Sequence, residues 1–134
     1  MKIDLSPLER AVARLAEGLE RWRAAPEDDQ LRDGLIQRFE FTYELCHRML
    51  RRYLESVAAT PEEIDRMPFP DLIRTGSEQG LLLRDWGAWR AYREMRNKTS
   101  HTYDEQVAME VVAGIEGFLE DARALCENLK ARLS

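Results

Sequence analysis

The chain has 134 residues, the length of one ordinary domain, and its residues are 44% hydrophobic and 34% charged. This composition supplies one apolar core under a heavily charged surface. A high content of charged residues with only 7 glycines favours an α-helical protein. The net charge of -5 gives no basis for non-specific binding to nucleic acid, although a local basic patch could still bind phosphate. We therefore expect a single all-α domain over residues 1–134.

The N-terminal segment carries acidic residues early and lacks the apolar stretch of a secretory signal peptide. No apolar run approaches the roughly 20 residues that cross a membrane. Cys46 and Cys126 fall on apolar helical stripes, which is typical of buried thiols in a reducing cytoplasm. Neither belongs to a CxxC or Cys/His pair with metal-ligand spacing. We expect a cytoplasmic protein with no membrane span, no metal site and no other cofactor.

Two long amphipathic helices are predicted in the N-terminal half. The first begins at Ser6-Pro7-Leu8-Glu9, a capping-box pattern with proline at the first helical position, and ends before Pro26. The second runs from Asp28 or Asp29 to about Ala58. It carries two apolar lines: Leu31, Leu35, Phe39, Thr42, Cys46, Met49 and Tyr53 form one, and Ile36, Tyr43, Leu50 and Val57 form the other. One line can face a bundle core, so the other requires a further helix or a second subunit.

A connector punctuated by prolines follows the second helix. Thr60-Pro61-Glu62-Glu63 has the pattern of a helix start, and Pro68 keeps that helix short. Pro70 can open another short helix over residues 71–79, which Gly80 would end.

Two further helices are predicted in the C-terminal half. Asp85 is a suitable N-cap for a helix that starts at Trp86, and Asp104 or a near neighbour caps the last helix. The last helix has one clean apolar line, formed by Val111, Ile115, Phe118, Ala122, Leu125, Leu129 and Leu133. Gly114 and Gly117 in this helix could mark a close approach of another helix. Together the elements predict an up-and-down four-helix bundle with a short-helix insert.

Arg96, His101 and Tyr103 bring a fixed cation, an imidazole and a phenol to the junction of the last two helices. A five-residue step turns about 500° on an unbroken helix, which leaves Arg96 and His101 about 140° apart. The intervening residues 97–100 propagate a helix poorly, apart from the lysine. The helix should therefore end or distort here, and His101 can then turn back toward Arg96.

If these side chains converge, they could cleave RNA. Arg96 would bind the phosphate, and His101 would transfer protons while the ribose 2′-hydroxyl attacks. One histidine is short of the acid and base that this reaction normally uses, and a symmetric dimer could supply a second His101 and Arg96. The alternative is an ordinary helix end that happens to carry these residues.

The segment Arg96–Tyr103 resembles the R-x4-6-H motif of the HEPN superfamily, in its R-x4-H-x-Y form. Three longer segments in the same order, at 36–54, 70–82 and 85–105, resemble the nucleotidyltransferase substrate-binding-protein family within it. The resemblance covers about residues 8–129. It implies a helical bundle that forms homodimers and a partner that is a minimal nucleotidyltransferase encoded beside it.

The resemblance also implies two alternative functions. In HEPN toxin–antitoxin pairs, the HEPN protein is a metal-independent endoribonuclease that acts on RNA, and the nucleotidyltransferase antitoxin neutralises it by AMPylation of the motif tyrosine. Arg96 and His101 would then be catalytic, Tyr103 would accept AMP, and Asn97 would help to position the phosphate. The alternative is a non-catalytic subunit that binds substrate for the nucleotidyltransferase.

Charged residues of the second helix leave two further questions open. Glu40 and Glu44 lie one turn apart and could serve Arg96 or His101 as hydrogen-bonding or basic partners, or they could be surface carboxylates paired with residues such as Arg48. Arg48, Arg51 and Arg52 could form a solvated face with ion pairs to Glu44 and Glu55, or a patch that faces phosphate. His47 is expected to be an ordinary helix residue.

Overall fold

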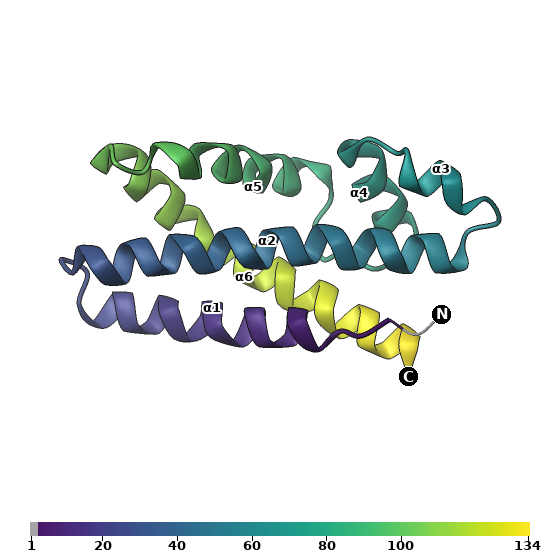
Figure 1. The fold of residues 1–134 in the computed structure, drawn as a ribbon, viewed down its shortest axis with the longest axis horizontal. Helices are drawn as coiled ribbons and strands as arrows, with labels where there is room; N and C mark the ends of the chain where they lie inside the picture. Colours follow the sequence, from purple (N-terminus) through teal and green to yellow (C-terminus); the bar gives the residue numbers. More distant parts are fainter. Residues whose placement is uncertain (1–2) are drawn as a thin grey trace.

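The computed structural model describes residues 3–134, and Met1 and Lys2 of the predicted domain lie outside them. The α-helices of the described part are α1 (Ser6–Ala24), α2 (Asp29–Val57), α3 (Pro61–Asp65), α4 (Phe69–Glu78), α5 (Trp86–Lys98) and α6 (Glu105–Leu133), and a short 3-10 helix, η1 (Thr99–His101), joins α5 to α6. The predicted all-helical architecture is confirmed. The helices α1, α2, α5 and α6 form the bundle, and α3 and α4 make the short-helix insert (Figure 1).

The long helix α2 is the centre of this arrangement. It runs beside α1 along most of the length of α1, and α6 packs against both of them (Figure 1). The shorter helix α5 lies on the other side of α2 and packs on α6, while α3 and α4 cover the end of α2 where its chain leaves the bundle. Because α2 contacts every other α-helix, residues on its different faces are directed toward different parts of the molecule.

Aspartate side chains fix the starts of three helices, as the sequence predicts for Asp85 and Asp104. Asp28 accepts hydrogen bonds from the Gln30 and Leu31 N–H groups at 2.9 and 3.2 Å, and Asp104 binds the equivalent groups of α6. Asp85 accepts from the N–H of Gly87 at 3.2 Å. Each carboxylate satisfies N–H groups that have no partner within their own helix.

The predicted capping box at Ser6 is wrong. Leu5 occupies the N-cap position of α1 and Ser6 is already helical, while Asp4 Oδ1 accepts a hydrogen bond from the Ser6 N–H at 2.9 Å. A carboxylate two residues earlier therefore binds the end of the helix in place of the serine hydroxyl. At α3 the Thr60 side chain likewise makes no capping bond.

Gly80 ends α4 as predicted, although α4 begins at Phe69, two residues earlier than expected. Gly80 has φ of +73°, a conformation that side-chain-bearing residues rarely adopt. The N–H of Leu81 then donates to the Gly76 carbonyl at 3.0 Å, which closes the helix terminus and reverses the chain toward α5.

Both apolar lines of α2 pack against other helices of the same chain. The second line therefore needs no second subunit to cover it. Of the second line, Ile36, Tyr43 and Leu50 are buried and only Val57 is exposed. Tyr43 and Phe39 pack on Phe118 of α6, with the rings of Phe39 and Phe118 edge to face at 4.9 Å. Burial also raises the pKa of Tyr43 to about 12.

The helices α5 and α6 approach closely at Gly114, one of the two glycines expected to mark such a contact. A Cβ atom at Gly114 would lie 2.5 Å from Sδ of Met95, so the thioether occupies the space that a larger residue would need. Both cysteines are buried free thiols, and burial raises the pKa of each. None of the helices within residues 3–134 has the length and apolarity to cross a membrane.

Candidate functional site at the end of helix α5

The helix break that the sequence predicts between Arg96 and His101 is present. The α-helix ends at Lys98, and the chain continues as the 3-10 helix η1 before Asp104 starts α6. The hydroxyl of Thr99 lies 2.7 Å from the Arg96 carbonyl, which is one of the carbonyls that a continuing helix would use. This hydrogen bond competes with the backbone pattern of a continuing helix and so favours an end of α5 at this point.

Arg96 reaches across from α5 to two carboxylates of α2. Its Nε donates to Glu44 Oε1 at 3.0 Å, and its Nη1 lies 3.3 Å from Glu40 Oε2. Glu40 and Glu44 are one turn apart on α2, so both face the same side of the helix and both contact the guanidinium. The Arg96 side chain is 33% exposed, and charge-assisted bonds orient its guanidinium.

Thr99 completes this cluster, although it is not among the site residues expected from the sequence. It is buried, and its Oγ1 accepts a hydrogen bond from Arg96 Nη1 at 3.1 Å. The same oxygen lies 3.1 Å from Glu40 Oε2, so the hydroxyl can donate to Glu40 or to the Arg96 carbonyl. The detectable signal is its spacing, because a threonine three residues after an arginine can reach back to it at a helix end.

His101 and Tyr103 form a second group beside this cluster. Both are exposed, Tyr103 at 86%, and their rings meet edge to face at 6.1 Å between centroids. No hydrogen bond or ion pair within residues 3–134 joins either side chain to Arg96. The chain thus brings Arg96 to Glu40 and Glu44, and His101 to Tyr103, in two neighbouring groups. Asn97 is exposed on the last turn of α5.

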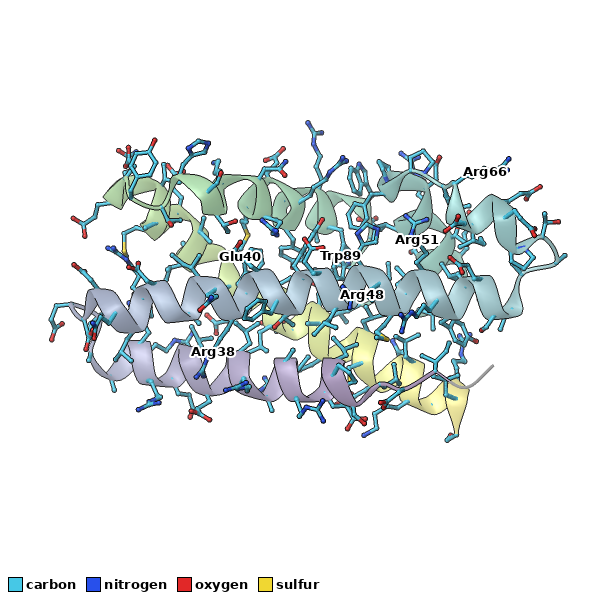
Figure 2. The ribbon with its side chains drawn as sticks, viewed as in Figure 1. Arg38, Glu40, Arg48, Arg51, Arg66 and Trp89 are labelled. Atoms are coloured by element: carbon cyan, nitrogen blue, oxygen red, sulfur yellow. The ribbon has the colours of Figure 1, made fainter. Side chains whose placement is uncertain are left out.

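The arginines of α2 do not make the ion pairs expected with Glu44 and Glu55. Glu44 binds Arg96, and Arg51 donates to the carbonyls of Ile64, Asp65 and Met67 at 2.5 to 3.2 Å. Arg51 therefore satisfies carbonyls at and just after the end of α3. Arg48 and Arg52 remain exposed (Figure 2 labels Arg48 and Arg51).

His47 lies in the packed region under the insert. Its ring meets the Phe69 ring edge to face at 4.6 Å, and its Nε2 is 3.3 Å from Arg51 Nη2. Burial lowers the pKa of His47 below its ordinary value of 6.5, and the charge of Arg51 lowers it further. This environment favours the neutral imidazole, as expected of an ordinary helix residue.

Comparison with known proteins places the whole helical unit in one family. Residues 3–131 match the family described as nucleotidyltransferase substrate binding protein like. The chain is 44% identical over 104 residues to a protein of Haemophilus influenzae named probable ribonuclease HepT, an alignment that covers 78% of this chain and 70% of that protein.

A solved structure from Haemophilus influenzae has the same fold. It is described as revealing the fold of a substrate-binding domain of a nucleotidyltransferase, and it is 36% identical to this chain with a TM-score of 0.89. The similarity covers 95% of this chain and 99% of that one. The resemblance to the HEPN superfamily is confirmed, and this chain belongs to the nucleotidyltransferase substrate-binding-protein-like family.

Proposed function

We propose that this protein is a metal-independent endoribonuclease of the HEPN toxin type, and that a minimal nucleotidyltransferase is its antitoxin. The observation that carries the proposal is the arrangement at the end of α5, where two carboxylates of α2 orient the Arg96 guanidinium and the residues that follow along the chain include an exposed His101 and Tyr103. The name of the Haemophilus influenzae relative, probable ribonuclease HepT, supports the RNase assignment. The family description supports the nucleotidyltransferase partner.

The reaction needs a phosphate site, a base and an acid. Arg96 leaves Glu40 and Glu44 to bind the scissile phosphate, where its planar fork stabilises negative charge on the phosphoryl oxygens. The ribose 2′-oxygen bonds to phosphorus, its proton passes to a base, and the 5′-oxygen leaves with a proton from an acid. His101 performs one of these transfers, and His101 of a second copy performs the other. The products are a 2′,3′-cyclic phosphate and a 5′-hydroxyl.

The exposure of Tyr103 suits a residue that a second enzyme modifies. In AMPylation the Tyr103 hydroxyl oxygen attacks the α-phosphorus of ATP, loses its proton and displaces pyrophosphate. The attached AMP would place a bulky anion against the His101 ring and compete with RNA for Arg96. The protein is incubated with ATP and the minimal nucleotidyltransferase encoded beside it. Mass spectrometry should then find that the peptide containing Tyr103 has gained the mass of one AMP group.

The RNase assignment is tested by cleavage of RNA in excess EDTA. Replacement of His101 by alanine should reduce cleavage at least about 100-fold, because general acid–base catalysis contributes that much or more. His47→Gln is the matched control, since it removes the other histidine, and it should leave the rate unchanged. Equal cleavage by the wild type and His101→Ala would show that the activity does not come from this site.

A second candidate function is a non-catalytic subunit that binds substrate for the nucleotidyltransferase. The observation that favours it is the pairing of Arg96 with two carboxylates, which offsets its charge. The description of the solved relative as a substrate-binding domain is in line with it. Isothermal titration with nucleotides, with and without the nucleotidyltransferase, should then detect binding in a protein that cleaves no RNA. Absence of binding in both titrations would contradict this candidate.

A further inference from the structure

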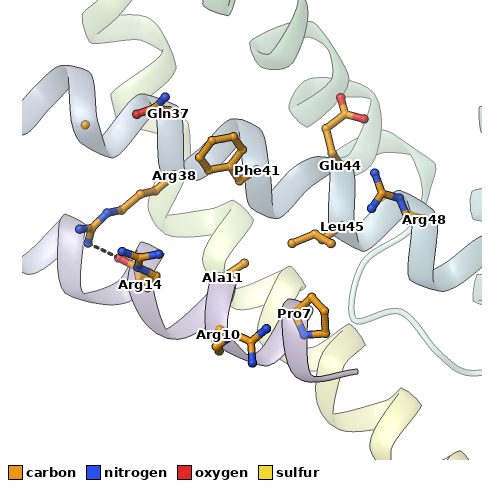
Figure 3. A pocket seen from close by; sticks show the side chains of 11 residues that line it. Pro7, Arg10, Ala11, Arg14, Gln37, Arg38, Phe41, Glu44, Leu45 and Arg48 are labelled. Carbon is orange, nitrogen blue, oxygen red and sulfur yellow. Dashed lines mark hydrogen bonds between the residues drawn. The ribbon is translucent and has the colours of Figure 1, made fainter. Parts of the chain in front are cut away.

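A groove of about 630 Å³ lies between α1 and α2, outside the cluster at the end of α5 (Figure 3). Its middle is apolar and is made by Pro7 and Ala11 of α1 and by Phe41 and Leu45 of α2. Arginines border this apolar strip, namely Arg10, Arg14, Arg38 and Arg48. The groove therefore combines apolar contact area with several fixed positive charges.

The charge of the groove is opposite to that of the chain. Arg10, Arg14 and Arg48 form no ion pair with any carboxylate in residues 3–134. Arg38 donates to the Arg14 carbonyl at 2.8 Å and lies 3.8 Å from Glu17. Only one acid, Glu44, lines the groove in the described part of the chain, and Arg96 already binds it. A groove with this excess of arginine, in a protein of net charge -5, is complementary to an anion.

Phe41 adds a flat aromatic surface to these charges. Its side chain is 58% exposed, while Phe39, Phe69 and Phe118 are buried in the core. An exposed aromatic ring flanked by arginines is the combination that proteins use to bind single-stranded nucleic acid, because bases stack on the ring and arginines bind the phosphates. Arginines at several points along the groove suit a ligand with repeated phosphates better than one with a single charge.

We propose that the groove between α1 and α2 binds single-stranded RNA, with a base stacked on Phe41 and phosphates on Arg10, Arg14 and Arg48. The inference rests on the proposed RNase function and adds a binding site for the strand away from the reacting bond. Glu44 links the two regions, since it lines the groove and binds Arg96 at 3.0 Å. A strand in the groove would thus lead toward the cluster that contains Arg96.

A second copy of this chain fits the groove less well than RNA. Two copies packed through this face would bring together four arginines from each copy, with only Glu44 from each to offset them among the groove-lining residues. Like charges this close repel, and burying them without partners costs free energy. The same charges bind a polyanion favourably.

The test uses a fluorescent oligoribonucleotide and the His101→Ala background, in which the RNA stays intact. Fluorescence anisotropy should find binding roughly fivefold or more weaker with Phe41→Leu, because leucine lacks the stacking face, and little change with Phe41→Tyr. Replacing Arg10 and Arg14 together by glutamine should weaken binding and reduce the slope of log K against log salt by about 0.7 for each lost phosphate contact. Arg52→Gln, an exposed arginine of α2 outside the groove, is the matched control and should change neither quantity.

The outcomes separate this inference from the proposed function. If the groove variants bind RNA with the same affinity and salt dependence as Arg52→Gln, the inference is overturned, even if the wild type cleaves RNA. A wild type that cleaves no RNA but binds it through Phe41 and the arginines overturns the RNase function and upholds the groove. Sedimentation velocity on the same samples gives a further check. If Phe41→Leu weakens RNA binding only by dissociating an oligomer, the groove serves a second copy and the inference is wrong.

Discussion

The Arg96 guanidinium is held in one orientation, and two carboxylates already offset its charge. Two carboxylates and the Thr99 hydroxyl fix its planar fork, which reduces the freedom that a flexible arginine would lose on binding phosphate. The same contacts must be exchanged for the phosphate, so they also weaken binding. In the proposed mechanism Glu40 and Glu44 therefore orient Arg96 before the phosphate binds, and they compete with the phosphate for the guanidinium.

At the residue scale, His47 should make the stability of the protein depend on pH. Its pKa is lower in the folded chain than the ordinary 6.5, so the unfolded chain binds more protons below that pH. Stability from this residue is therefore fully present above pH 6.5 and falls as the pH drops from there toward the folded pKa. His47→Gln should remove this part of the pH dependence.

Urea unfolding at pH 7.5 and at successively lower pH values measures the effect. The comparison of the wild type with His47→Gln matters, because titrating carboxylates such as Asp4 contribute equally to both proteins. An unchanged difference in unfolding free energy between the two proteins at all pH values would contradict the prediction.

At the scale of elements, helix ends decide how the bundle connects. Aspartates start α2, α5 and α6, Gly80 ends α4, and the Thr99 hydroxyl occupies a carbonyl where α5 ends. Each of these contacts joins residues that lie close together in the sequence, so the ends of the helices could be predicted to within a few residues. The start of α1 differs from the capping box that the sequence predicts, because the carboxylate of Asp4 binds the Ser6 N–H and the serine is already helical.

Two glycines should respond to alanine with opposite signs. Gly80→Ala should lower the free energy of unfolding by about 1 kcal/mol, because a side chain at φ of +73° is strained. Gly34→Ala should raise it by roughly 0.5 to 1 kcal/mol, because Gly34 lies inside α2 with open space where a Cβ would be. Urea denaturation of both variants measures the two changes. A stabilising Gly80→Ala would mean that the left-handed turn does not hold the end of α4.

At the scale of the whole molecule, one chain buries its own core but carries only one candidate proton-transfer group at the site. Both apolar lines of α2 are covered by α1, α4, α5 and α6, so the apolar surface no longer argues for a second subunit. A homodimer is favoured by the chemistry of the site and by the family resemblance. RNA cleavage by this mechanism needs an acid and a base, and His101 is the only exposed histidine among the described residues.

A homodimer that shares its sites predicts activity that depends on protein concentration. RNA cleavage per molecule should fall as dilution dissociates the dimer, and the midpoint should match the dissociation constant from sedimentation equilibrium. Constant specific activity across the concentration range where the protein is shown to be monomeric would contradict the shared site. In that case a single His101 would be sufficient for the chemistry.

The sequence by itself determined the helical class, the order and approximate ends of the helices, the break after Arg96 and the family. These follow from apolar periodicity, caps and breakers that act between near neighbours, and from motifs in a fixed order. The tertiary structure alone decided which carboxylates meet Arg96 and Thr99: Glu44 lies 52 residues before Arg96, and Glu40 lies 59 residues before Thr99. It also decided that Arg51 binds carbonyls and that arginines of α1 and α2 border one groove with Phe41. Such contacts depend on how helices pack and rotate against one another, and no local pattern in the chain specifies that.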